Sequence, residues 1–329
     1  MSAPLISVAL PVRNGANYLA AALDSILAQS FEDFELHVSD NASDDATPAI
    51  LAEYAARDPR VKISRSAELI PQAANVNRAV RLSASPWVKL FCHDDLMRED
   101  CLAQIAEAIG QVAGTNTGLI GNGERHLFGN GYLAPALPEQ GLLRLAGRDA
   151  IARKLWDVKR AVPFPALTTA TVRRDAFEAA GGFDPRYLYF DLFCWLELLT
   201  RYDYAVVTAP LTTNRIHAAQ VAVLARASLR ELDDFRGYLP QFVKSHGVAL
   251  GMGAKARLRL RLIPAALAAR GMAGNLIAGR TSRALRTFAK APAIYWPMLP
   301  LLVARAVCAE RARLGKLADH VPPEFLYPA

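Results

Sequence analysis

The first hundred residues alternate between short apolar runs and longer stretches in which apolar residues recur at helical spacing. The apolar runs have the length of buried strands, and they span residues 5–14 (ending in a turn), 34–39, 61–64 and 86–92. The helical pattern fills the intervals, most clearly at residues 18–29 and 73–82. Strands and helices that alternate at this length favour a parallel β-sheet with helices on both faces, so the sequence predicts an α/β fold.

Polar residues follow three of these predicted strands at their C-terminal ends. The first strand ends in the turn Pro11 to Asn14, the second in residues 40–47, and the fourth in His93, Asp94 and Asp95. In an open α/β sheet, ligands bind at the carboxyl ends of the strands. Adjacent carboxylates suit a divalent cation there, because Mg²⁺ uses one or two carboxylates together with substrate phosphates. Taken alone, an Asp pair at a strand end is equally typical of a turn.

The order and spacing of these segments resemble the family 2 glycosyltransferases, which have the GT-A fold and use nucleotide-sugar donors. The family's first strand ends in Pro-x-x-Asn, and its second in a stretch close to Asp-Asp-Gly-Ser-Thr-Asp-Gly-Thr. Its Asp-x-Asp-Asp metal motif falls on residues 92–95, and the match covers residues 5–220. The resemblance implies a mostly parallel GT-A sheet flanked by helices. We expect a nucleotide-sugar-binding half at 1–97, an acceptor-binding half at 98–222 and a basic helical C-terminal region at 223–329.

The resemblance places the donor nucleotide against Pro11, Asn14 and Asp40, and the metal at Asp94. Asp40 corresponds to the position associated with the base, although an Asp in this place also stabilises a turn through its side chain. Cys92 stands where the family has its first metal-motif Asp. A hard cation prefers oxygen to sulfur, so we expect Cys92 to be a packed strand residue. The metal is expected to be Mg²⁺ or Mn²⁺, and the donor a UDP-sugar by family frequency, with dTDP and GDP open.

Three further residues near the donor have competing explanations. Asn77 and Arg78 fall on the helix before the fourth strand, where the family often has Asn and a basic residue, and a solvated helix face accounts for them equally well. Asp45 is explained equally by capping the next helix, which we expect to have Thr47 as N-cap and Pro48 at its first position.

The acceptor side is predicted from residues 189–198. This segment resembles the family's Glu-Asp-x-x-x-Trp-Leu stretch, whose Asp is the general base, although Phe190 replaces the Glu. Asp191 and Trp195 stand four residues apart, on one helical face. The apolar neighbours of Asp191 are expected to raise its pKa toward a range useful for a base. Asp191 would also suit the N-cap of this helix. A direct in-line displacement inverts the anomeric configuration, so an inverting transferase is expected.

His217 lies in a segment similar to the family's Arg-x-His stretch after the last strand of the catalytic domain. The resemblance implies that a neutral imidazole there completes the metal site or binds the diphosphate. His93, by contrast, is expected to be structural.

Composition adds a basic C-terminal region to this picture. The 329 residues are 52% hydrophobic with a net charge of +7, and residues 251–329 hold 13 Lys and Arg against 3 Asp and Glu. Basic helices with neighbouring Trp, Tyr and Leu suit an anionic membrane surface, while packing on the catalytic domain or a second subunit is the alternative. The uncharged stretch 291–304 is too short to span a bilayer, which takes about 20 apolar residues. The charge has no accompanying recognition motif for nucleic acid, so we expect no such partner.

Cysteine usage and the N-terminus bear on the compartment. The four cysteines have neither a paired framework nor zinc-type spacing, and no signal peptide pattern is present. We therefore expect a cytoplasmic protein. The basic C-terminal region further suggests peripheral attachment at the inner face of the cytoplasmic membrane.

Three functions are compatible with these residues. The leading one is a metal-dependent inverting glycosyltransferase that acts on a glycan or lipid-linked acceptor in surface polysaccharide or glycolipid synthesis. The second is a catalytically inactive GT-A scaffold that binds nucleotide or glycan partners, to which Cys92 and Phe190 give some weight. The third, a nucleotidyltransferase, would have a Gly-rich basic loop after the first strand, and residues 11–15 do not fit that pattern.

Overall fold

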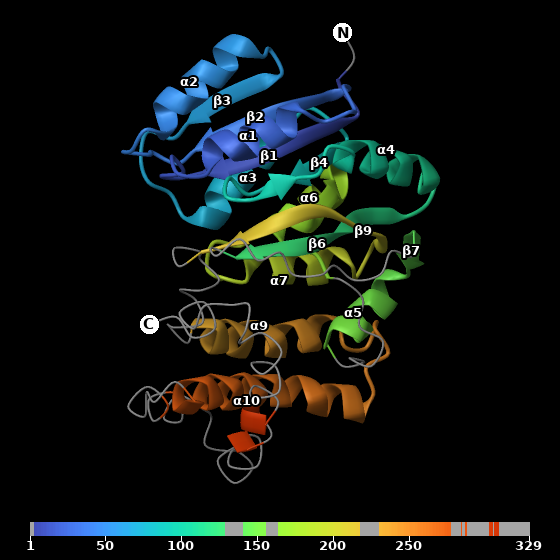
Figure 1. The fold of residues 1–329 in the computed structure, drawn as a ribbon. Helices are drawn as coiled ribbons and strands as arrows, with labels where there is room; N and C mark the ends of the chain where they lie inside the picture. The colour runs from blue at the N-terminus through green and yellow to red at the C-terminus, as the bar shows by residue number, and fades with distance from the viewer. Residues whose placement is uncertain are drawn as a thin grey trace. The chain divides into compact units, whose positions relative to one another are not determined.

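The computed structural model describes residues 3–128, 141–155, 164–217 and 230–277, with isolated helical residues at 284, 287, 303–304 and 306–308. The fold is a wide β-sheet flanked by helices, together with a separate helical part (Figure 1). The chain divides into two compact units. The first comprises Met1–Leu127 and Leu133–Arg215, and the second Phe128–Tyr132 and Ile216–Ala329. The boundaries expected at residues 97 and 222 stay predictions.

The N-terminal half of the sheet is parallel, as its alternating pattern predicts. Its strands stand in the order β3-β2-β1-β4, and each pairs in parallel with its neighbours. They are β1 (Ile6–Val12), β2 (Phe34–Asp40), β3 (Val61–Arg65) and β4 (Trp87–Leu90). Helices α1 (Leu19–Leu27), α2 (Thr47–Arg57) and α3 (Gln72–Leu82) connect them in turn. The polar segments that follow β1, β2 and β4 therefore emerge at one edge of the sheet.

The sheet continues beyond β4 in the order β8-β6-β9-β5, with β7 also paired to β9. The added strands are β5 (Leu96–Met97), β6 (Thr117–Phe128), β7 (Leu142–Leu145), β8 (Ala170–Arg173) and β9 (Asp203–Ile216). β8 runs antiparallel to both β4 and β6, and β9 runs antiparallel to β5 and β7. The sheet is therefore mixed, with its parallel half on the donor side of the predicted site.

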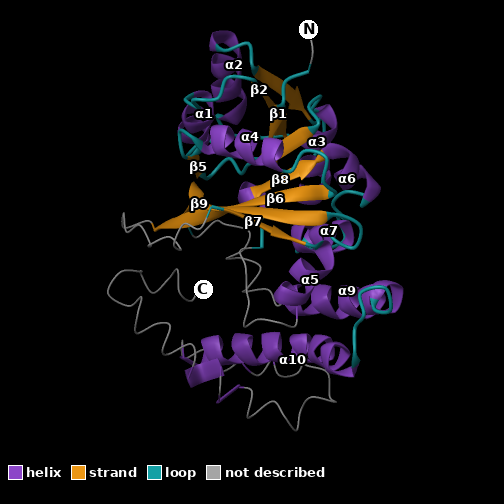
Figure 2. Cartoon of the chain, turned by 90° about the vertical axis from the view of Figure 1, so that its right-hand side faces the viewer, coloured by secondary structure: helices purple, strands orange, loops and turns teal. Residues whose placement is uncertain are grey.

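The main core lies between the sheet and the helices α1 and α4 (Cys101–Gln111). Alternate residues of β1 face this core, because side chains of a strand point to opposite faces in turn. In α1 the buried residues recur at helical spacing, at Leu19, Ala22, Leu23 and Ile26. Figure 2 shows α1 and α4 on one side of the sheet and α3 and α6 (Arg174–Ala179) on the other. Both faces are covered, so β1, β2 and β4 are buried over almost their whole length.

The start of α2 differs from the expected cap. Thr47 is the first residue of the helix, and Ala46 rather than Thr47 occupies the N-cap position. The Thr47 N–H donates to the Asp45 carboxylate at 2.9 Å, and the Thr47 hydroxyl accepts from the Gly15 N–H at 2.8 Å. The capping function therefore belongs to Asp45, because its short acidic side chain satisfies an N–H that the helix leaves unpaired.

The second unit contains the helices α9 (Arg230–His246) and α10 (Ala254–Ile277). They pack together through Leu232 of α9 and Ala268 and Ala269 of α10. Among the residues that the structure describes, no helix is both long and apolar enough to cross a membrane. Most of the uncharged stretch 291–304 lies outside the described residues.

Candidate functional site

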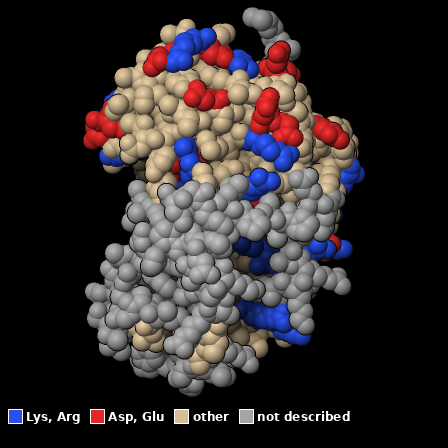
Figure 3. Space-filling model, in the orientation of Figure 1, with Lys and Arg blue, Asp and Glu red and all other residues tan. Residues whose placement is uncertain are grey.

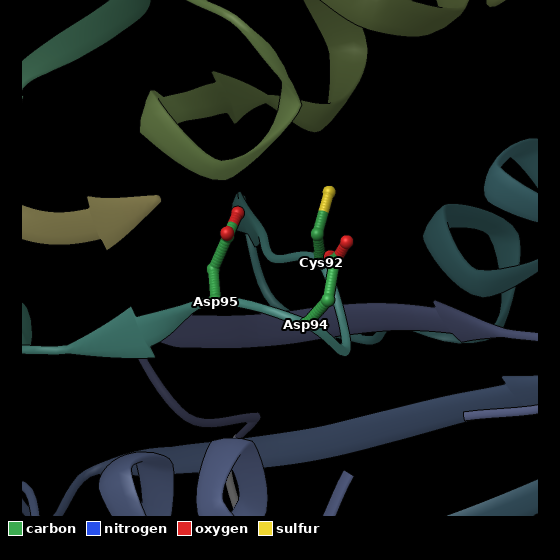
Figure 4. Close-up of side chains that lie close together, drawn as sticks. All are labelled: Cys92, Asp94 and Asp95. Carbon is green, nitrogen blue, oxygen red and sulfur yellow. The ribbon is translucent and has the colours of Figure 1, made fainter. Parts of the chain in front are cut away.

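Three potential metal ligands meet in the turn that follows β4. The Cys92 sulfur and carboxylate oxygens of Asp94 and Asp95 all lie within 4.8 Å of one another. Figure 4 shows the three side chains projecting to the same side of the turn. Cys92 and Asp94 are partly buried, whereas Asp95 is buried. The predicted metal residue Asp94 therefore lies in an acidic cluster, beside a thiol.

Asp95 is held by protein donors on both of its oxygens. One accepts a hydrogen bond from the Thr168 hydroxyl, and the other accepts the Arg215 backbone N–H at 3.1 Å. Burial, followed by the neighbouring charge of Asp94, raises the pKa of Asp95 to about 7. Asp95 thus supports the turn, and metal binding by Asp94 stays a prediction. The sequence analysis named Asp95 as part of the adjacent carboxylate pair and assigned the metal to Asp94 alone.

Arg215, at the end of β9, joins this turn to the start of α1. Its Nε donates to the Asp94 carbonyl at 2.5 Å, and its Nη2 donates to the Tyr18 carbonyl at 3.0 Å. The guanidinium also lies over the Tyr18 ring, 4.9 Å from its centre. Burial lowers the pKa of Arg215. Sequence reasoning had weighed His217 in this segment and missed Arg215, two residues earlier.

A fully buried lysine lies beneath the cluster. The Lys89 ammonium donates to the Asn122 side-chain oxygen at 2.8 Å and to the Thr168 carbonyl at 2.6 Å. Burial lowers the pKa of Lys89 to about 8. Thr168 therefore connects the two layers, because its carbonyl accepts from Lys89 while its hydroxyl donates to Asp95. A charged residue inside an apolar strand was the sequence signal for Lys89.

Asp40 lies at the end of β2 with only 1% of its surface exposed. One carboxylate oxygen accepts the Ser43 N–H at 3.1 Å and the Ser43 hydroxyl at 2.5 Å. The second oxygen faces Arg65 at 3.2 Å in an ion pair that lacks hydrogen-bond alignment. The turn-stabilising role of Asp40 is therefore present, and it uses only one of the two oxygens.

The loops after β1 and β2 are joined through Asn14. Its backbone has φ 49°, in the left-handed region that Asn tolerates better than most residues. Its N–H donates to the Ser43 hydroxyl and its side-chain oxygen accepts the Asp44 N–H, both at 3.0 Å. Pro11 lies in β1 directly opposite Ser39 of β2. The residues predicted for the nucleotide thus belong to one connected pair of loops.

Asn77 and Arg78 of α3 both bind to other parts of the protein. The Asn77 amide makes two hydrogen bonds with the backbone of Phe183, at 2.7 and 2.9 Å. The Arg78 guanidinium donates to the Ser64 hydroxyl and to the Arg65 carbonyl, the latter at 2.7 Å. Neither side chain is therefore a merely solvated one, and contact with the donor stays a prediction for both.

Asp191 lies in the first turn of α7 (Phe190–Leu198), partly buried. Tyr189, not Asp191, occupies the N-cap, and an Asp191 oxygen accepts the adjacent Leu192 N–H at 2.7 Å. Burial raises the pKa of Asp191, as its apolar neighbours predicted. The pKa of the Cys92 thiol is raised by burial, by Asp95 and Asp94, and also by Asp191. Asp191 therefore lies within electrostatic reach of the acidic cluster.

Trp195 is fully buried one helical turn after Asp191. Its ring meets Phe183 edge-on, with ring centres 5.4 Å apart, and Phe183 also contacts Phe190 at 5.2 Å. These contacts anchor α7 in the core and so orient Asp191. A direct contact of Trp195 with an acceptor stays a prediction.

His217 is partly buried and directly follows β9. It belongs to the second unit, which is described by itself. Its role at the metal or the diphosphate stays a prediction.

Comparison with known proteins adds family and fold. The family model described as "Glycosyl transferase family 2" matches residues 7–178. A chondroitin synthase of Escherichia coli is 31% identical over 137 residues, which are 40% of this chain and 20% of that protein. A PGL/p-HBAD biosynthesis glycosyltransferase of Mycobacterium tuberculosis is 37% identical over 113 residues, 34% of this chain and 44% of that protein. The matches thus span less than half the length of these relatives.

Two solved structures have a similar fold. The mannosyltransferase PcManGT from Pyrobaculum calidifontis, in complex with GDP-Man and Mn²⁺, aligns with a TM-score of 0.57 and 20% identity. That alignment covers 96% of this chain and 88% of the other. Residues 1–349 of S. aureus TarS, in complex with UDP-GlcNAc, align with a TM-score of 0.59 and 14% identity, covering 88% and 89%. At these identities the likeness concerns the fold.

Proposed function

The chain belongs to glycosyl transferase family 2, and we propose that it moves a sugar from a nucleoside-diphosphate sugar to a hydroxyl of a glycan or lipid-linked acceptor. One observation carries the proposal. Asp94, from the turn after β4, and Asp191, from α7, both lie close enough to Cys92 to raise the pKa of its thiol. This supports a role for Asp94 at the donor phosphates and a role for Asp191 at the acceptor hydroxyl of the same site.

The donor nucleotide would bind at the two loops joined by Asn14. The second oxygen of Asp40 would accept a hydrogen bond from a base N–H or a ribose hydroxyl. Arg65, its present ion-pair partner, has a side chain that is 48% exposed and also donates to the Ser43 carbonyl at 2.7 Å, and the nucleotide would replace it as the partner of this buried carboxylate. A UDP-sugar is the first donor to test, followed by GDP- and dTDP-sugars, since the fold relatives were solved with GDP-Man and with UDP-GlcNAc.

The residues fit a divalent cation that prefers oxygen ligands. Both oxygens of Asp95 accept hydrogen bonds from protein donors, and the raised pKa of Cys92 keeps its thiol protonated and a poor ligand. Asp94 would therefore hold Mg²⁺ or Mn²⁺ together with donor phosphates and water, with His217 as a further proposed ligand. Such an ion, when bound, neutralises charge that develops on the leaving diphosphate. The relative PcManGT was solved with Mn²⁺.

Asp191 would act as the general base. It would take the proton of the acceptor hydroxyl as that oxygen attacks the anomeric carbon, opposite the departing diphosphate. Its raised pKa brings the carboxylate closer to neutral pH, where a base accepts a proton most effectively while still ionised. An attack from the side opposite the leaving group inverts the anomeric configuration. Arg215 and Thr168 would hold the Asp94–Asp95 turn in place during this step.

The C-terminal region would bring the enzyme to its acceptor. Residues 251–329 carry the excess of basic charge, which favours a peripheral place on an anionic membrane. A cytoplasmic enzyme at the inner membrane face would fit surface polysaccharide or glycolipid synthesis. The names of two relatives, a chondroitin synthase and a PGL/p-HBAD biosynthesis glycosyltransferase, support a glycan product.

A second candidate is an inactive scaffold that binds nucleotide or glycan partners. Cys92 and Phe190 favour it, because each replaces an acidic residue of the family pattern. Asp40, Asp94 and Asp191, which are all present, favour turnover instead.

Release of nucleoside diphosphate from a panel of donor sugars with Mn²⁺ separates the two candidates. We expect release from one donor, and a loss of about 100-fold or more in Asp191→Asn. Asp175→Asn, which alters an exposed carboxylate paired with Arg173, is the matched control and should retain activity. Binding of a nucleotide without release from any donor would support the scaffold. NMR of the product should show the anomeric configuration inverted, and a retained configuration would refute the in-line step.

A further inference from the structure

An apolar groove of about 360 Å³ lies between α9 and α10 in the second unit. Its volume falls within the range of small-molecule sites. α9 lines it with residues 235–243 and α10 with residues 257–264, in both cases at positions that share one helical face. The buried side chains of Phe235, Leu239 and Leu260 form its apolar surface.

Two prolines explain why the helices leave this space open. Pro240 of α9 and Pro264 of α10 both line the groove from within their helices. A proline inside a helix has no N–H for the carbonyl four residues earlier, and its ring presses on that turn. Each helix therefore lacks one regular backbone hydrogen bond on the side that lines the groove. The groove is thus specified by the sequence of both helices.

Three arginines line the same groove. Arg236 comes from α9, and Arg257 and Arg261 stand one turn apart on α10. The Arg257 guanidinium is held near the start of α10, where its Nε donates to the Met252 carbonyl at 3.0 Å. Figure 3 shows Lys and Arg side chains gathered at the lower right, over the first half of α10.

This arrangement of charge favours an anionic ligand. Like charges four residues apart on a helix repel each other, and cations near a helix N-terminus oppose the helix dipole. The first turn of α10 contains no acidic residue, and none occurs between Gly251 and Ala309. The acidic residues of α9 are Glu231, Asp233 and the buried Asp234, and Asp234 directly precedes Phe235 and Arg236, which line the groove. The three arginines give the groove a positively charged lining, to which an anion is complementary.

We propose that this groove binds the phosphate headgroup of an anionic membrane lipid. The arginines would contact the phosphate, and the apolar surface would take the first carbons of the lipid chain. Two large apolar side chains nearby are exposed: Leu258, beside Arg257, is 58% exposed, and Val248, in the connection between the helices, is 83% exposed. Both would enter the membrane interface, whereas a free phosphate ion would leave them in water. The inference rests on the membrane partner proposed above and assigns it a site.

Vesicle flotation of the full chain tests this site with a matched pair of variants. Arg257→Gln with Arg261→Gln removes two charges from the groove. Lys255→Gln with Arg259→Gln removes two charges at the same spacing, from exposed positions on the opposite side of the same helix. Wild type should bind vesicles of phosphatidylcholine with phosphatidylglycerol and should not bind phosphatidylcholine alone. The groove variant should lose about tenfold more binding than its control.

An equal loss of vesicle binding in both double variants would overturn the proposal. It would mean that the total charge of the helix, rather than the groove, governs binding. Val243→Phe tests the apolar part, since the larger ring fills the groove and leaves the charge unchanged. It should weaken vesicle binding while the thermal unfolding temperature stays near that of wild type, and full binding would count against the site. Millimolar inorganic phosphate should compete poorly with the vesicles. Full displacement of the vesicles by phosphate would identify a simple anion site and refute the lipid site. Binding to an acidic protein but not to vesicles would also refute the lipid site.

These outcomes are separate from those of the transfer reaction. Release of nucleoside diphosphate from the donor, measured without vesicles, should be unchanged in both double variants because none of the mutated residues belongs to the proposed donor, metal or acceptor site. Vesicle binding without donor turnover would refute the transferase and leave the groove. Donor turnover together with equal vesicle binding by the two double variants would support the transferase and refute the groove.

Discussion

Replacing Lys89 with Met should change how the stability of the protein depends on pH. The Lys89 ammonium is fully buried, and burial lowers its pKa from 10.5 to about 8. A difference of this size is equivalent to about 3 kcal/mol against the charged form in the folded state. Met has a similar shape and no charge, so the variant removes that cost. It also leaves the Asn122 side-chain oxygen and the Thr168 carbonyl without their donor, at about 1–3 kcal/mol each.

The pH dependence separates these two opposing effects. Below about pH 8 the lysine is protonated in both states, so wild type bears the full cost of the buried charge. As the pH rises toward 10.5, the folded state has lost the proton while the unfolded state still binds it. The free energy of unfolding of wild type therefore rises with pH relative to the variant. Between pH 7 and pH 10 the gain should be about 2 to 3 kcal/mol.

Urea unfolding of both proteins at several pH values measures this gain. Taking the difference between wild type and Lys89→Met cancels the groups that titrate alike in both. Lys255→Met, at an exposed position of the second unit, serves as the control and should give a nearly constant difference. A constant difference for Lys89→Met would refute the buried charge beneath the acidic turn, and a fall with pH would contradict the sign of the argument.

Three further predictions concern the site itself. Because burial raises the pKa of Asp191, the acid limb of the pH–rate profile should lie above the range of an ordinary carboxyl group, and an acid limb near pH 4 would contradict its role as base. Gly15→Ala would bring a Cβ within 2.6 Å of the His93 ring. We expect the variant to lose about 1–3 kcal/mol of free energy of unfolding and to bind nucleotide more weakly next to Asp94. An unfolding free energy and a nucleotide affinity equal to those of wild type, both measured by calorimetry, would contradict this packing. Cys92→Ala should retain metal-dependent nucleotide binding in titration calorimetry, and its loss would make the sulfur a ligand.

The parallel half of the fold was predictable because its hydrophobic pattern is local. Each apolar run between β1 and β4 is followed by a helix with its own period, and the resulting order agrees with the sheet. The antiparallel half is different, since β6 and β9 are long and pair with strands distant in sequence. Such pairings depend on packing that no local pattern records.

The candidate site was predictable where a residue belongs to a recognisable motif. Asp94 and Asp191 were identified in this way, and the structure brings both near Cys92. Arg215 was missed because its contacts are with the backbone of residues more than a hundred positions away. Backbone partners have no sequence signature. The cap of α2 was misplaced by one residue for a simpler reason, since Asp45 and Thr47 are both good capping residues.

Thermal shift with a nucleotide panel, with and without Mn²⁺, tests the central claim most directly. The panel contains UDP, dTDP, GDP and CMP, and the proteins are wild type and Asp94→Ala. We expect one nucleoside diphosphate to raise the unfolding temperature of wild type in the presence of Mn²⁺, and this increase to be lost in Asp94→Ala. No increase with any nucleotide, or an equal increase in the variant, would contradict a metal-assisted donor site at Asp94.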